Sequence, residues 1–139
     1  MRIALIDQSF HIKTESTLFL RDLLRRLGIV DHFFVDINDL AEVADGNYDV
    51  TVFLQTEFCC PYFLARGKRT VLVPMYDACA NMPGAYWRAM AGARVISFCR
   101  RLHVRMLECG LESIYLQYFP NPSTSQVVED FSNLRGFQQ

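Results

Sequence analysis

Two short polar stretches carry most of the side chains in this sequence that could do chemistry. The first, residues 8–15, reads QSFHIKTE, follows Asp7, and contains His11, Lys13 and Thr14. Such side chains can hydrogen-bond a ligand rich in hydroxyls, and His11 or Lys13 could meet a phosphate. The alternative is that they are solvated loop residues and helix caps. The stretch has no glycine, which argues against a dinucleotide fingerprint or a P-loop, because both bring the backbone close to phosphate.

The second stretch holds Tyr76 and Asp77, directly after an apolar run. Asp77 could act as a general base toward a sugar hydroxyl, or simply hydrogen-bond it, if it lies within about 3 Å of the proton. It could equally cap the turn that follows. Glu57 is a weaker candidate, and His32 and His103 are interpreted as structural.

The elements that must position these residues follow from hydrophobic periodicity. Six apolar runs alternate with helical patterns, which predicts an α/β protein: a Rossmann-like, doubly wound, mostly parallel six-stranded sheet with helices on both faces. The predicted strands are residues 2–7, 32–37, 48–55, 70–75, about 95–98 and 114–119, and the predicted helices include residues 16–27, 39–44, 58–68 and 85–91. In the strand order 3-2-1-4-5-6, the topological switch between strands one and four would bring the two polar stretches together.

Several residues are expected to mark helix ends. Thr14 or Ser16 should cap the first long helix, and Ser97 is a better cap than Cys99 for the helix that follows the fifth strand. Gly110 should end that helix, because glycine adopts the left-handed conformation easily.

Composition sets wider limits. The chain has 139 residues, 51% hydrophobic and 21% charged, with a net charge of -1, which predicts a globular protein with no general attraction to nucleic acid. We expect residues 1–122 to form one domain and residues 123–139 a helix or the start of a linker. Five cysteines without the paired spacing of a zinc site predict reduced thiols and no metal. No cofactor is expected. No apolar run approaches the roughly 18 residues of a membrane span, so a cytoplasmic protein is expected.

The run VISFCRRLHVRMLECGLESIYLQYFPNP, residues 95–122, resembles the last strand, helix and strand of the N-terminal domain in group 1 GT-B glycosyltransferases. In that family a strand ends in Ser, a helix bears spaced leucines and closes in Gly, and a strand leads to the second domain. The corresponding positions here are Ile96, Ser97, Leu102, Leu107, Gly110 and Asn121.

The resemblance covers roughly residues 2–122 and implies the acceptor-side domain of an enzyme that transfers a sugar from a nucleotide-sugar donor to a hydroxyl acceptor. It implies a catalytic role for Asp77 and substrate contacts for His11, Lys13, Thr14 and Tyr76. Many of these enzymes place a His-Asp pair where this sequence has Tyr76 and Asp77, so Tyr76 departs from the family pattern.

The resemblance also implies that the donor binds mainly to a second domain missing from this sequence, so the chain is expected to be a truncated domain and inactive alone. The alternative is a free-standing flavodoxin-like module that binds a small ligand or another protein. An apolar surface near Phe119 and Phe131 would favour the first reading and could lead to homo-oligomers.

Overall fold

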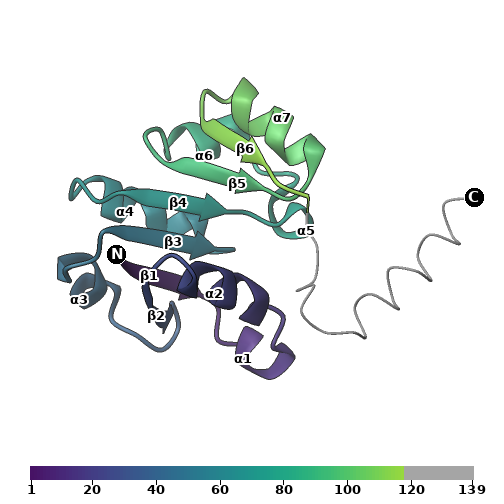
Figure 1. Ribbon diagram of the computed structural model, residues 1–139. Helices are drawn as coiled ribbons and strands as arrows, with labels where there is room; N and C mark the ends of the chain where they lie inside the picture. Colours follow the sequence, from purple (N-terminus) through teal and green to yellow (C-terminus); the bar gives the residue numbers. More distant parts are fainter. Residues whose placement is uncertain (118–139) are drawn as a thin grey trace, which may run out of the picture.

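Six parallel strands form one sheet in the computed structural model, which describes residues 1–117 (Figure 1). The elements in chain order are β1 (Arg2–Asp7), α1 (His11–Thr14), α2 (Leu18–Arg25), β2 (Ile29–Phe34), α3 (Leu40–Asp45), β3 (Val50–Leu54), η1 (Glu57–Cys59), α4 (Cys60–Leu64), β4 (Thr70–Val73), α5 (Tyr76–Cys79), α6 (Gly84–Arg88), β5 (Arg94–Ser97), α7 (Arg100–Glu108) and β6 (Glu112–Tyr115).

The strand order is β2-β1-β3-β4-β5-β6, with every pairing parallel. The predicted Rossmann-like class is confirmed, but the predicted order 3-2-1-4-5-6 is wrong, because β3 pairs with β1 and places Ile6 opposite Phe53. Burial explains this: four of the five residues of β3 are buried, whereas none of the six residues of β2 is. A strand that is apolar on both faces gains most from an interior position. The topological switch therefore lies between β1 and β3.

Helices cover both faces of the sheet, as predicted. On one face α2 contributes Leu20 and Leu24 to a core with Leu5 and Val52. On the other face α3, α4, α6 and α7 pack around a larger core that includes Trp87. The short helices α1 and α5 lie at the edge where the strands end (Figure 1). Each replaces part of a predicted loop by one helical turn.

The N-caps predicted at Thr14 or Ser16 and at Ser97 are wrong. Thr17 occupies the N-cap position of α2, and the hydroxyls of Thr14 and Ser16 bond each other at 2.8 Å. Ser97 lies inside β5, where its buried hydroxyl pairs with that of Ser113 at 3.0 Å, and Cys99 precedes α7 instead. In both cases the hydroxyls have partners other than the free N–H groups of the helix they were expected to cap.

All five cysteines carry free thiols. Among residues 1–117, none of the helices has the length and apolar character needed to cross a membrane. The helix or linker predicted for residues 123–139 and the apolar surface predicted at Phe119 and Phe131 lie outside the described residues.

Gly110 ends α7 with a φ of +81°, as its position in the sequence predicted. Gly110→Ala is expected to lower the free energy of unfolding by about 1 kcal/mol, because a Cβ disfavours the left-handed conformation. Among residues 1–117, no atom beyond Gly110 and its two chain neighbours lies within 4 Å of an added Cβ, so the expected loss comes from the backbone conformation. Urea denaturation measures it. Gly110→Asn is the matched control and should lose less, since asparagine tolerates this conformation. Equal stability of the alanine variant and the native protein would contradict the assignment.

Candidate functional site

A pocket opens at the edge of the sheet where β1, β3 and β4 end. This switch pocket has a volume of about 320 Å³ and is lined by His11 and Thr14 of α1, Gln55 after β3 and Asp77 of α5, among others. Parallel sheets of this kind bind ligands outside the carboxyl ends of their strands, at the switch point. The switch pocket is therefore where a ligand is expected.

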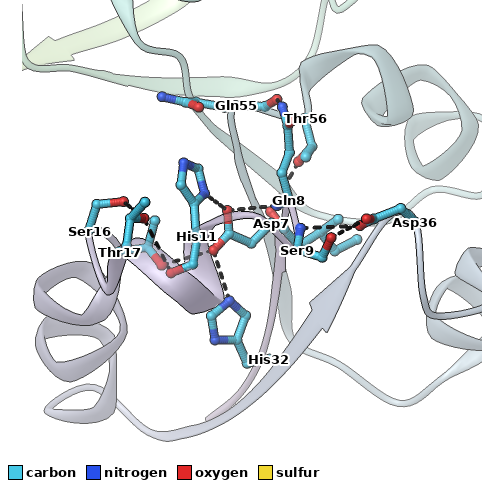
Figure 2. Close-up of polar contacts among 12 residues, drawn as sticks. Asp7, Gln8, Ser9, His11, Ser16, Thr17, His32, Asp36, Gln55 and Thr56 are labelled. Atoms are coloured by element: carbon cyan, nitrogen blue, oxygen red, sulfur yellow. Dashed lines mark hydrogen bonds and ion pairs between the residues drawn. The ribbon is translucent and has the colours of Figure 1, made fainter.

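The carboxylate of Asp7, the last residue of β1, organises the wall of this pocket (Figure 2). Asp7 is fully buried. It accepts hydrogen bonds from the backbone N–H of Gln8 at 2.7 Å, the hydroxyl of Thr17 at 2.9 Å, Nε2 of His32 at 3.1 Å, and most closely from Nδ1 of His11. One buried carboxylate thus joins β1, α1, the start of α2 and β2.

The same contacts keep Asp7 ionised. Burial acts to raise the pKa of this carboxyl group. The hydrogen bonds from His32, His11, Gln8 and Thr17 together outweigh burial and lower the pKa of Asp7 below its usual value. Asp7 is therefore a carboxylate throughout the pH range in which a histidine can accept a proton.

His11 is the residue through which this carboxylate can act on a ligand. Because Nδ1 faces Asp7, we assign the proton to Nδ1, which leaves the lone pair of the neutral ring on Nε2. Within residues 1–117 Nε2 has no hydrogen-bond partner, and the ring extends from α1 toward Gln55 (Figure 2). The ring of Phe10 lies beside it, with centroids 4.0 Å apart. A histidine oriented by a carboxylate in this way is suited to general-base catalysis.

Side-chain contacts hold the loops around the switch pocket in place. Nε2 of Gln8 donates to the carbonyl of Gln55 at 2.7 Å, and the hydroxyl of Thr56 donates to the carbonyl of Ile6 at 3.0 Å, so the segments after β1 and β3 are joined. Gln55 has a φ of +55°, a left-handed conformation that is uncommon for a residue other than glycine. Such conformations concentrate at functional sites.

The structure brings three of the five predicted site residues together. His11, Thr14 and Asp77 line the switch pocket, although they belong to segments more than 60 residues apart in the chain. Asp77 makes no helix-cap bond, so the capping alternative is not observed. Lys13 is exposed and does not line the switch pocket. Tyr76 is 41% exposed, and its hydroxyl accepts a hydrogen bond from Arg101 at 3.4 Å.

Sequence reasoning missed two residues of this site. His32 was interpreted as structural, yet it binds Asp7 across the β1–β2 pairing, and Thr17 does so from the start of α2. Neither position has a local signal that singles it out. The pairing of the strands explains the contact between Asp7 and His32. In the parallel pair β1–β2, Leu5 lies opposite His32, so Asp7 is only two residues further along its strand.

Metal binding has no support from the geometry. Within the described part of the chain, no group of three or more His, Cys, Asp or Glu side chains is placed to hold a metal ion. Comparisons with known proteins add no assignment, because neither the family models nor the curated proteins searched match this sequence. The fold and the switch pocket define the class of the chain: a Rossmann-like α/β protein with a pocket at the switch point of its sheet, lined by both apolar and polar side chains.

Proposed function

We propose that this chain is the acceptor-side domain of a GT-B glycosyltransferase, which transfers a sugar from a nucleotide-sugar donor to a hydroxyl acceptor. The observation that carries the proposal is the pair of His11 and Asp7 beside the switch pocket. The similarity of residues 95–122 to the end of such a domain also supports it.

The chemistry of the pair suits an acceptor hydroxyl. In this proposal Nε2 of His11 takes the proton of the hydroxyl as its oxygen bonds to the anomeric carbon of the donor sugar, and the bond from that carbon to the nucleotide diphosphate breaks. Asp7 stabilises the imidazolium that forms. Asp77 has no hydrogen bond or ion pair within residues 1–117, so its carboxylate can accept a bond from a second hydroxyl. Donor contacts would come from a second domain.

Acceptor binding is the testable part of this proposal for the chain alone. Neutral glycosides titrated into ¹⁵N-labelled protein should shift the resonances of the switch pocket, including the His11 ring, in a saturable way. His11→Gln keeps a donor toward Asp7 but removes the base, and should weaken binding about tenfold, which is about 1.4 kcal/mol. No sugar transfer is expected from the chain by itself.

The matched control is His103→Gln, since His103 lies on α7 and bonds Ser113 far from the switch pocket. It should leave glycoside binding unchanged. The proposal fails if no glycoside perturbs the switch pocket, or if both glutamine variants bind equally well.

A second candidate is a flavodoxin-like binding module, and the strand order favours it. The order β2-β1-β3-β4-β5 is that of flavodoxin-like sheets, which bind FMN at the same switch point. Quenching of FMN fluorescence by the protein at micromolar concentration would support this candidate, and its absence would count against FMN as the ligand.

A further inference from the structure

A second pocket lies on the other side of His11, over the edge strand β2. This β2 pocket has a volume of about 400 Å³ and is lined by residues that include Glu15, Arg21 and His32. His11 and Thr17 line both the β2 pocket and the switch pocket, so the two cavities share a wall. The proposed sugar transfer uses the switch pocket and gives the β2 pocket no role.

Arg21 is the cation that lines this pocket, and one of its guanidinium nitrogens has no hydrogen-bond acceptor within the described residues. Its Nε is buried and forms no hydrogen bond within the described residues. The carboxylate of Asp22 is 3.6 Å from that nitrogen, which is a weak ion pair and too long for a hydrogen bond. A buried guanidinium nitrogen without a hydrogen-bond acceptor is rare in proteins. An oxygen atom of a bound ligand could be the missing acceptor.

His32 places a second nitrogen at the same cavity. Its Nε2 bonds Asp7, and its other ring nitrogen points away from that carboxylate (Figure 2). In the neutral ring this second nitrogen is an acceptor, so it can accept a hydrogen bond from the O–H of a protonated phosphate. Asp7 does not line the β2 pocket, and its carboxylate is occupied by four donors. Within the described residues, the carboxylate that lines the β2 pocket is that of Glu15, which is exposed. The interior of the pocket is therefore suited to an anion, with Glu15 limiting its affinity.

We propose that the β2 pocket binds a phosphate group, held by the guanidinium of Arg21 with His32 beside it. The planar fork of arginine matches the oxygens of phosphate, and its bonds to phosphate are charge-assisted and strong. The phosphate could be free or esterified to an organic molecule. In the second case the shared wall places the rest of the molecule next to His11, and only this extension rests on the proposed glycosyltransferase function.

Titration with inorganic phosphate at constant ionic strength tests the site directly, with ¹⁵N chemical shifts of the Arg21 side chain and α2 as the readout. We expect a dissociation constant on the order of millimolar. Arg21→Gln should weaken binding at least tenfold. Should that variant fold poorly, Arg21→Lys keeps the charge, loses the fork, and should bind several-fold more weakly than the native protein.

Two further variants distinguish phosphate binding in the β2 pocket from general attraction of phosphate to surface charge. Glu15→Gln removes the opposing carboxylate and should tighten binding about threefold. Arg25→Gln removes an exposed cation one turn further along α2 that does not line the pocket, and should change binding less than twofold. Native-like binding by Arg21→Gln and Arg21→Lys, or an equal loss in Arg21→Gln and Arg25→Gln, would overturn the proposal.

The source of the phosphate is settled by a parallel titration with glucose 6-phosphate. Tighter binding than inorganic phosphate, with additional shifts at His11, indicates a phosphorylated organic ligand. Equal binding without those shifts indicates free phosphate. Because neutral glycosides test the switch pocket separately, failure of the phosphate site and failure of the proposed function give different results.

Discussion

Asp7→Ala is expected to lower the free energy of unfolding by about 3–5 kcal/mol, because it leaves several buried hydrogen-bond donors without an acceptor. The side chains of His11, Thr17 and His32 all lose their acceptor. These donors come from three different segments, so the variant also loosens the packing of α1 and α2 against β1 and β2. Urea denaturation monitored by the fluorescence of the buried Trp87 measures the loss.

Asp7→Asn distinguishes the charge from the acceptor. Asparagine keeps one carbonyl oxygen but brings an NH₂ group toward donors, so a smaller loss of about 1–3 kcal/mol is expected. The control is Asp36→Ala. Asp36 is exposed and accepts hydrogen bonds from the backbone N–H and the hydroxyl of Ser9, so Asp36→Ala should lower the free energy of unfolding clearly less than Asp7→Ala does. Equal effects of the two alanine variants would show that Asp7 does not organise the site.

The pH dependence of the free energy of unfolding is a second test of the role of Asp7. Its pKa is lowered in the folded protein, so at acidic pH the unfolded chain binds a proton that the folded chain does not. The stability that Asp7 contributes is therefore present above the unfolded pKa of about 3.9 and is lost as the pH falls through the folded pKa. In Asp7→Ala this part of the acid destabilisation should disappear.

Glu57→Gln is expected to stabilise the protein at pH 8 by about 3 kcal/mol, the free energy that corresponds to the raised pKa of this carboxyl group. Glu57 is 5% exposed, and within residues 1–117 its Oε1 has no hydrogen-bond partner. Burial raises the pKa of Glu57 to about 7, against smaller lowering effects from its own backbone N–H and from Tyr86. Keeping a proton on a buried carboxyl group avoids the unfavourable desolvation of its charge.

The sign of the effect follows from the raised pKa. Between the ordinary glutamate pKa of 4.5 and about 7, the folded chain holds a proton that the unfolded chain has released. Rising pH therefore favours unfolding, and the free energy of unfolding should fall by about 3 kcal/mol between about pH 5 and pH 8 through this group. Glutamine cannot ionise, so the variant should lack this fall and match the native protein near pH 4.5.

The neighbouring cysteine thiols do not contribute to the pH dependence expected from Glu57. Burial raises the pKa of Cys59 and of Cys60 to about 11, so both thiols stay protonated across the pH range of the experiment. Glu108→Gln, at an exposed position of α7, is the control and should keep the native pH profile. The assignment is wrong if Glu57→Gln shows the same fall in stability as the native protein.

Local sequence patterns predicted the six strands and the longer helices, but they missed α1 and α5 and placed β2 at residues 32–37 in place of Ile29–Phe34. The alternation of apolar runs and helical periodicities predicted six strands in one sheet, because burial on one or two faces requires those spacings. Gly110 was recognised as a helix end because the left-handed conformation favours one residue type. His11, Thr14 and Asp77 were identified as a candidate site because the ends of parallel strands meet at one edge.

Tertiary structure alone decided the strand order and the contacts of Asp7. Whether β3 lies beside β1 or beyond β2 depends on which strand gains more from burial on both faces, a comparison between segments that no local window contains. Asp7 meets His32 and Thr17 only because β1 pairs with β2 and α2 packs back over the sheet, across separations of 25 and 10 residues. A hydrophobic pattern reports how deeply each residue is buried, whereas the partners of a buried charge depend on how distant segments are placed in space.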